Sequence, residues 1–227
     1  MRKILKKSTI VLVMLTFILA MININGVNTS FADTKDSTQT TTENNQSDSS
    51  SSDETSSTDE NNTEDDENVL KTDDGFKYTV EDDEVTIKGY EGSKTTLTIP
   101  NEIDGKKVTK IGANAFDGNT SITSVEIQDG VTTIDSYAFY NATALESVSI
   151  PESVTTMNEG AFANCTALSS VNLPSKLKTI SYGLFASCSN LTKIEIPEGV
   201  TSIDGYAFYT CTSLKEINIP EKVASIG

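Results

Sequence analysis

The sequence predicts a repeat solenoid in its C-terminal part, of a class that is α/β or mainly β. We expect a stacked parallel β-sheet on one face and short extended segments with helical or 3-10 turns on the other. Two observations carry this prediction: apolar residues recur at a fixed 23-residue step, and each repeat contains one segment with the alternation of a β-strand. Repeats of this length are typical of solenoids, in which neighbouring turns of chain complete one another's core.

Six apolar columns keep the 23-residue step through the C-terminal part of the chain. The columns are Phe116, Phe139, Phe162, Phe185 and Phe208; Val108, Val131, Val154, Leu177, Val200 and Val223; Ile111, Ile134, Met157, Ile180, Ile203 and Ile226; Ile122, Leu145, Leu168, Leu191 and Leu214; Val125, Val148, Val171, Ile194 and Ile217; and Ile127, Ile150, Leu173, Ile196 and Ile219. Chance does not hold so many columns in register, so each repeat is one turn of the solenoid.

Each repeat begins with a predicted strand. Val125 and Ile127 point inward while Ser124 and Glu126 point outward, because side chains alternate between the two faces of a strand. In four later repeats a proline follows the last inward residue, and its missing N–H ends the ladder there. Strands stacked in this way pair in parallel.

The remainder of each repeat contains a second extended stretch and a tight turn. Residues 131–134 are an example of the stretch, and Ala138-Phe139 an example of the turn, which we expect to hold a short helix or 3-10 piece. The phenylalanine column then fills the middle of the coil.

These residues carry a resemblance to a known family. The segments 150–157, Ile-Pro-Glu-Ser-Val-Thr-Thr-Met, and 161–168, Ala-Phe-Ala-Asn-Cys-Thr-Ala-Leu, resemble the BspA-like leucine-rich repeats of bacterial secreted and surface proteins. The resemblance covers 99–227, as about five repeats with the last one incomplete, and implies a solenoid of leucine-rich-repeat type. It also implies adhesion to host matrix or plasma proteins and to other cells. The family offers no catalytic motif to carry over.

The N-terminal segments predict export. Basic residues precede an apolar run from Ile10 to Ile22, and small residues at 30 and 32 complete a signal peptide over 1–32, with cleavage after Ala32. The alternative is an uncleaved anchor, for which the run is short. We therefore expect a secreted or cell-surface protein that meets the membrane only through the signal peptide during export.

The next segment, 33–75, is an acidic linker rich in Ser, Thr, Asp, Glu and Asn, and we expect it to be disordered because it has almost no apolar surface to bury. It is either a spacer or a solubilising tail. Residues 76–98 alternate around Glu81-Asp82-Asp83-Glu84 and predict an N-terminal capping hairpin. At Gly227 the repeat pattern stops before its next turn, which favours a fragment over an exposed final rung.

Composition argues against catalysis and nucleic-acid binding. The chain has a formal net charge of −16 and no cluster of basic residues beyond Lys7, so we expect no nucleic-acid partner. It has no histidine, which removes the usual general base and the commonest zinc ligand. We therefore expect no enzyme, no catalytic residue, no cofactor and no metal site. Cys165, Cys188 and Cys211 share one column and are interpreted as small buried thiols, in preference to a disulfide or a three-thiolate metal site.

The outward face of the predicted parallel sheet is the first candidate surface for an extracellular protein or polysaccharide. Its residues are Ser124, Glu126, Ser147, Ser149, Ser170, Asn172, Lys193, Glu195, Glu216 and Asn218. They include no aromatic anchor of the kind that binding hot spots favour. A second candidate is the edge that carries Tyr137, Tyr140, Tyr182, Tyr206 and Tyr209, although packing between turns explains these rings equally well.

Three functions follow from these surfaces. The first is an adhesin or other protein-binding solenoid. The second is a passive spacer within a larger envelope protein. The third is a binding module attached to a wall-active enzyme.

Overall fold

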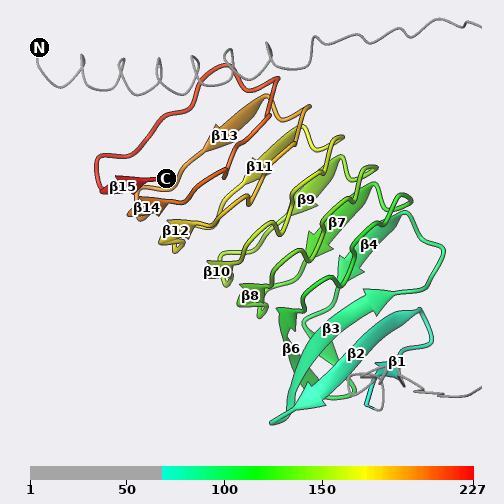
Figure 1. The fold of residues 1–227 in the computed structure, drawn as a ribbon. Helices are drawn as coiled ribbons and strands as arrows, with labels where there is room; N and C mark the ends of the chain where they lie inside the picture. The colour runs from blue at the N-terminus through cyan, green and yellow to red at the C-terminus, as the bar shows by residue number, and fades with distance from the viewer. Residues whose placement is uncertain (1–67) are drawn as a thin grey trace, which may run out of the picture.

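The computed structural model describes residues 68–227, which form a parallel β-solenoid of about six turns (Figure 1). This confirms the predicted fold class. The predicted signal peptide, and the predicted linker as far as residue 67, lie outside the described residues.

One face of the solenoid is a five-stranded sheet whose strands are all parallel. Its strands, in spatial order, are β13 (Lys193–Glu195), β11 (Ser170–Asn172), β9 (Ser147–Ser149), β7 (Ser124–Ile127) and β4 (Thr96–Ile99). Val125 pairs with Val148, and Val171 pairs with Ile194, so the apolar columns of the sequence are the inward rows of this sheet. The rungs rise one above another in Figure 1.

The second face consists of strands that also pair in parallel, and all of them except β6 are two residues long. They are β6 (Lys106–Ile111), β8 (Thr133–Ile134), β10 (Thr156–Met157), β12 (Thr179–Ile180), β14 (Ser202–Ile203) and β15 (Ser225–Ile226). Ile111 pairs with Ile134, and Ile134 with Met157, which places another of the sequence columns in register. The ladder is interrupted once, between β10 and β12.

A hairpin covers the first rung of the solenoid. It consists of β2 (Phe76–Glu81) and β3 (Glu84–Tyr90), joined by Asp82 and Asp83, which both have positive φ as a tight two-residue hairpin turn requires. Strand β3 then pairs in parallel with β6, so the cap continues the second face. The sequence predicted a capping hairpin over 76–98, whereas the hairpin ends at Tyr90 and β4 begins at Thr96.

The linker interpretation does not hold for its last residues. Strand β1 (Leu70–Lys71) pairs antiparallel with β2, inside the segment that composition assigned to the linker. Backbone hydrogen bonds to a neighbouring strand fix these residues, and the polar composition around them gave no sign of that partner.

The first rung is longer than the others. Ile99 pairs with Ile127 across 28 residues, because the segment between β4 and β6 contains the extra strand β5 (Glu102–Ile103). Strand β5 folds back onto β6 through Asp104 and Gly105, both with positive φ.

The phenylalanine column forms a stack through the centre of the solenoid. The centroids of Phe116 and Phe139 are 4.8 Å apart with planes at 2° to one another, and those of Phe139 and Phe162 are 5.1 Å apart at 5°. The separation grows to 5.7 Å between Phe162 and Phe185, and to 5.9 Å between Phe185 and Phe208. Aromatic, aliphatic and thiol side chains together make one continuous core.

The expected helical or 3-10 turns are absent from residues 68–227, which contain no helix. In the turns, amides that bond to the next rung alternate with amides that bond within the turn. Phe116 N–H donates to Ala138 O on the next rung (2.7 Å), whereas Asn119 N–H donates to Phe116 O of its own turn (3.2 Å). A helix would direct every amide to its own carbonyls. The same residues therefore contain no helix that could span a membrane.

Two columns of positive φ produce this alternation, since they turn the peptide planes in a regular way. The columns are Asn114, Tyr137, Gly160, Gly183 and Tyr206, and Gly118, Asn141, Asn164, Ser187 and Thr210. Glycine and asparagine adopt such values readily, but a tyrosine does so at a cost of about 1–2 kcal/mol.

Candidate binding surfaces

The structure brings the predicted sheet-face residues together on the outer side of the five-stranded sheet. Ser124, Ser147, Ser170 and Lys193 pair in one row, and Glu126 pairs with Ser149 beside it. Nine of the residues are exposed and Ser124 is half-buried. Glu195 makes a bridge to Asn218, so the second row continues past the last strand, while Glu216 lies outside any strand.

Strand β4 extends both rows by residues that the sequence interpretation missed. Thr96 pairs with Ser124 and Thr98 pairs with Glu126, and both threonines are exposed. The missed signal is the alternation of Thr96-Leu97-Thr98-Ile99, which the longer first rung moves out of the 23-residue register.

Two pairs of side chains on the sheet face contact each other, one through an ion pair and one through a hydrogen bond between hydroxyls. Lys193 Nζ lies 2.7 Å from Glu195 Oε1, and this contact raises the pKa of Lys193 and lowers that of Glu195. Ser147 Oγ donates to Ser124 Oγ at 3.1 Å. Both ionised groups of the pair are largely exposed, so water and salt screen their attraction. The face is polar, and it is close to neutral where these two charges meet.

The tyrosines lie on the turn edge of the solenoid, as the sequence placed them. Tyr137, Tyr182, Tyr206 and Tyr209 are all exposed, between 36% and 57% of their surface. They also contact one another edge to face: Tyr182 and Tyr206 at 5.4 Å between centroids, and Tyr206 and Tyr209 at 5.4 Å. Packing between turns therefore occurs, but it leaves a large part of each ring in solvent.

Small residues separate these rings and leave a groove, which we call the tyrosine groove. It is lined by Tyr137, Glu159, Gly160, Ala163, Tyr182, Gly183, Ala186, Tyr206 and Tyr209, and encloses about 210 Å³. Its lining is mainly apolar, with Glu159 as the single charged residue in it. The groove arises because two successive rungs carry glycine and alanine where the rungs on either side carry tyrosine.

The ring of Tyr137 lies so close to the backbone of residue 160 that only glycine fits there. A Cβ at Gly160 would lie 2.5 Å from Tyr137 Cε1, so the ring covers the backbone of the next rung directly. At Gly183 a Cβ would meet only Ala186, at 3.9 Å, so the space above this residue is open. Tyr137 is further fixed by its hydroxyl, which donates to Glu159 Oε1 at 2.6 Å. This hydrogen bond, together with burial and the Glu159 charge, raises the pKa of Tyr137.

The three cysteines are buried free thiols, as the sequence indicated. Each Sγ donates to a backbone carbonyl of the phenylalanine column: Cys165 to Phe139 (3.1 Å), Cys188 to Phe162 (3.1 Å) and Cys211 to Phe185 (3.0 Å). Burial raises the pKa of Cys165 and of Cys211 to about 12, and that of Cys188 further still. Such thiols are inert packing residues.

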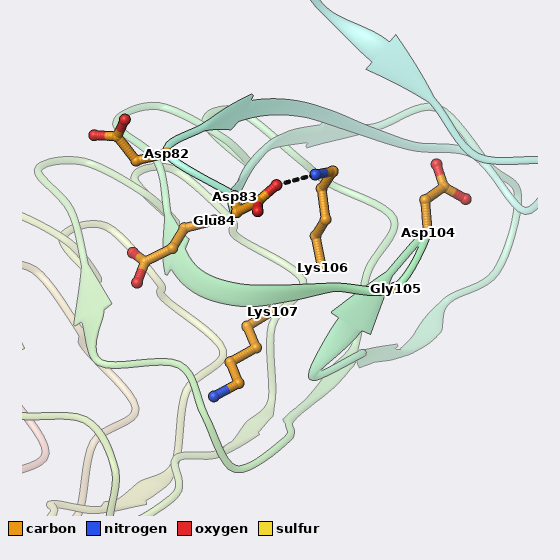
Figure 2. A pocket seen from close by; sticks show the side chains of 7 residues that line it. All are labelled: Asp82, Asp83, Glu84, Asp104, Gly105, Lys106 and Lys107. Atoms are coloured by element: carbon orange, nitrogen blue, oxygen red, sulfur yellow. Dashed lines mark hydrogen bonds and ion pairs between the residues drawn. The ribbon is translucent and has the colours of Figure 1, made fainter.

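A second hollow, of about 440 Å³, lies between the tip of the β2–β3 hairpin and the turn that joins β5 to β6 (Figure 2). It is lined by Asp82, Asp83, Glu84, Asp104, Gly105, Lys106 and Lys107. Lys106 forms an ion pair with Asp83, and this hydrogen bond lowers the pKa of the Asp83 carboxyl. In Figure 2 the other carboxylates point apart. Within residues 68–227 no group of side chains has the arrangement of a metal site.

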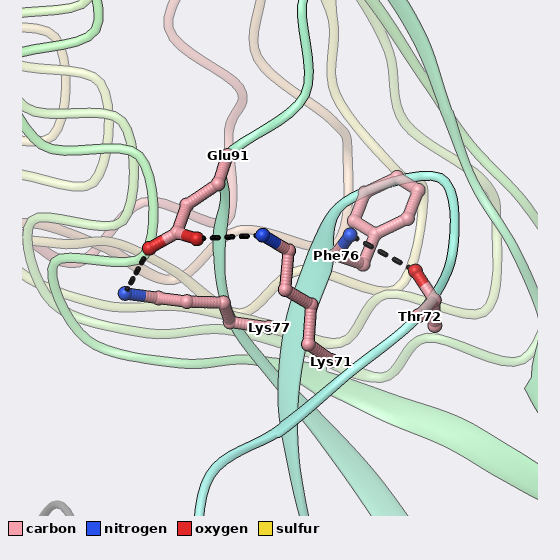
Figure 3. Close-up of polar contacts among 5 residues, drawn as sticks. All are labelled: Lys71, Thr72, Phe76, Lys77 and Glu91. Carbon is pink, nitrogen blue, oxygen red and sulfur yellow. Dashed lines mark hydrogen bonds and ion pairs between the residues drawn. The ribbon is translucent and has the colours of Figure 1, made fainter.

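The other end of the cap is fastened by one carboxylate between two lysines (Figure 3). Glu91 lies 2.9 Å from Lys71 Nζ and 3.1 Å from Lys77 Nζ, and the Lys71 hydrogen bond, followed by that of Lys77, lowers the Glu91 pKa. Thr72 Oγ1 accepts a 3.0 Å hydrogen bond from Phe76 N–H. These contacts tie β1 to the cap and play a structural part.

Half-buried Asp135, two residues before Tyr137, bonds to the rungs on both sides of its own. Lys110 Nζ lies 2.5 Å from Asp135 Oδ2, and Asn158 Nδ2 donates to Oδ1 at 2.7 Å. Burial pushes the Asp135 pKa up, but Lys110, Asn158 and the Ser136 amide together hold it below its ordinary value.

Comparison with known proteins agrees with this architecture. The profile of the BspA type leucine rich repeat region matches residues 107–227 in six copies, more than half of the chain. No curated protein sequence matches.

Among solved structures, the chain is similar to a leucine rich repeat protein of T. pallidum, at 26% identity and a TM-score of 0.61 over 70% of this chain and 86% of that one. It is also similar to a leucine rich cell surface protein of Faecalibacterium prausnitzii A2-165, at 31% identity and a TM-score of 0.54, over 70% of this chain and 50% of that one. The pneumococcal vaccine antigen PcpA shares the fold, at 19% identity and a TM-score of 0.55, over 70% of this chain and 46% of that one.

Proposed function

Because this chain belongs to the BspA-type leucine-rich repeat family, we propose that it is a non-enzymatic, secreted or cell-surface protein that binds an extracellular protein through its sheet face. The observation that carries the proposal is the outer surface of the five-stranded sheet, where polar side chains lie in two rows. Such a surface meets a partner with many hydrogen-bonding groups at a fixed spacing, since parallel strands lie about 4.8 Å apart.

Three further observations support the proposed location and the proposed lack of catalytic activity. The N-terminal sequence has the layout of a signal peptide. One structure similar to this chain is described as a cell surface protein. The buried, raised-pKa thiols and the absence of histidine leave the chain without the usual nucleophile and base.

Retention of the purified protein on immobilised matrix proteins, plasma proteins and cell-wall polysaccharide tests the proposal. We expect saturable retention on a protein ligand that is lost when Glu126, Lys193 and Glu195 are replaced together by alanine. In a matched control, Lys178, Glu198 and Glu221 are replaced by alanine. This triple variant removes the same number of positive and negative charges from exposed positions away from that face. Equal loss in both triple variants would point to net charge in place of a site and would contradict the proposal.

A second function, a passive spacer in a larger envelope protein, is favoured by one specific observation. Lys193 forms an ion pair with Glu195, and Ser147 donates a hydrogen bond to Ser124. Some of the polar groups of the sheet face therefore already have partners within the chain. A spacer predicts that the folded protein, as judged by circular dichroism, is retained on none of the immobilised ligands.

A further inference from the structure

The tyrosine groove has the form of two aromatic ridges with a slot between them. The first ridge is the ring of Tyr137, which lies over Gly160 and is held by Glu159. The second is the edge-to-face cluster of Tyr182, Tyr206 and Tyr209. Gly183 lies between the ridges with open space above it, so the slot is empty of the chain's own side chains.

The spacing of the ridges suits one kind of peptide backbone. Tyr137 and Tyr182 occupy rungs that lie two steps apart, and at the phenylalanine stack of the same turns these two steps measure 5.1 and 5.7 Å between ring centroids. A polyproline II helix advances about 9.3 Å in each turn of three residues. One turn of such a peptide, laid along the solenoid axis, is therefore slightly shorter than the two steps that separate the ridges.

The chemistry of the groove also suits this backbone. Polyproline II has no internal hydrogen bonds, so its carbonyl groups require outside donors. Within residues 68–227 the hydroxyls of Tyr182, Tyr206 and Tyr209 take part in no hydrogen bond, and each can donate one. Flat tyrosine rings and small alanine or glycine floors accept proline rings, as in the aromatic-lined grooves that bind proline-rich segments elsewhere.

The negative charge of the groove and of the chain favours a positively charged partner. Glu159 is the only charged residue in the lining, one of its oxygens accepts from Tyr137, and no lysine or arginine lies in the groove. The chain as a whole carries a formal net charge of −16. A peptide with arginine or lysine beside its prolines is attracted by both, and an acidic one is repelled.

We propose that the tyrosine groove binds a proline-rich, positively charged segment of another protein in the polyproline II conformation. This inference rests on the proposed binding function and adds a second surface with a defined class of partner. The proposal also explains why two successive rungs carry glycine and alanine. A tyrosine at these positions on either rung would fill the slot.

Calorimetric titration of the purified protein with a synthetic peptide of repeated Pro-Pro-Arg units tests the inference. We expect saturable binding of one peptide per chain. A Gly-Gly-Arg peptide of the same length keeps the charge without the conformation, and a Pro-Pro-Glu peptide keeps the conformation with the opposite charge. Both should bind at least about tenfold more weakly, since each removes one of the two features that the groove recognises.

Two variants test the place of binding. Ala186→Tyr fills the slot with a residue that the same column already carries at Tyr140 and Tyr209, so the fold accommodates it. Tyr182→Ala removes one of the three rings of the second ridge. Each should weaken Pro-Pro-Arg binding by at least about tenfold, the range of an aromatic hot spot. The control is Asp117→Tyr, which places a tyrosine in the same column on a rung outside the groove and should change the affinity far less.

Several results would overturn the inference: no saturable binding of the Pro-Pro-Arg peptide, equal binding of Gly-Gly-Arg, or unchanged binding by Ala186→Tyr. Titration with a neutral oligosaccharide is run in parallel, and displacement of the peptide by it would assign the groove to sugars instead. The sheet-face proposal is tested separately. Retention that depends on Glu126, Lys193 and Glu195 would stand even if no peptide bound the groove.

Discussion

Replacing Phe162 by alanine should destabilise the solenoid more than the same change at the end of the stack. Phe162 is fully buried, with Phe139 at 5.1 Å on one side and Phe185 at 5.7 Å on the other. Truncating a buried phenylalanine to alanine costs about 3–5 kcal/mol. Because Phe162 loses two stacked neighbours, we expect a value near the top of that range, roughly 4–5 kcal/mol.

Phe208→Ala is the matched control. Phe208 is only half-buried and has one stacked neighbour, Phe185 at 5.9 Å, so its truncation should cost about 2 kcal/mol, less than for a fully buried ring. The difference between the two variants is the informative quantity, since the chemistry of the change is identical.

Urea unfolding followed by far-UV circular dichroism and tyrosine fluorescence measures both free energies of unfolding. The tyrosine signal is usable because the chain has no tryptophan. Repeat proteins unfold in segments when a central interface is weakened, so Phe162→Ala should also lower the m-value. A cost below about 1 kcal/mol for Phe162→Ala, or one smaller than that of Phe208→Ala, would refute the view that the stack couples the rungs.

Three further predictions concern pH, the turn glycines and the thiols. Because the folded-state pKa of Asp135 is depressed below its ordinary 3.8, the stability it contributes is present above that value and lost as the pH falls through the folded pKa. Asp135→Asn should reduce the acid dependence of the unfolding free energy, and an unchanged slope below pH 3.8 would contradict this. Gly160→Ala and Gly183→Ala should each cost about 1–2 kcal/mol from left-handed backbone strain, but only Gly160→Ala should push the Tyr137 ring from its carboxylate and return the Tyr137 pKa toward its ordinary value in an ultraviolet titration. The cysteines should fail to react with a thiol reagent in the folded protein and react fully in denaturant; rapid reaction without denaturant would show that the column opens.

Much of the architecture could be predicted from spacing alone. Leu145 and Leu168, one repeat apart, both lie in the core because a turn of chain that repeats at a constant length returns each side chain to the same depth. Alternation in Ser124-Val125-Glu126-Ile127 placed two side chains inside and two outside for the same reason.

The turns could not be predicted in this way. The Ala138-Phe139 segment has residues that suit a helix, yet its amides alternate between its own carbonyls and those of the next rung. That choice depends on a neighbouring rung being present, which local sequence does not express. Strand β1 was missed for the same reason, since Leu70 and Lys71 are strand only through their partner β2.

The sequence by itself determined the period, the inward columns and the polar outer rows, because these depend on the order of residues within one repeat. Only the tertiary structure decided that Tyr137 lies over Gly160, that Tyr182 leans on Tyr206, and that open space remains above Gly183. Those positions depend on side-chain directions on neighbouring rungs and on backbone that turns left-handed at a tyrosine. A groove is the volume that packing leaves unfilled, and it exists only once every rung is in place.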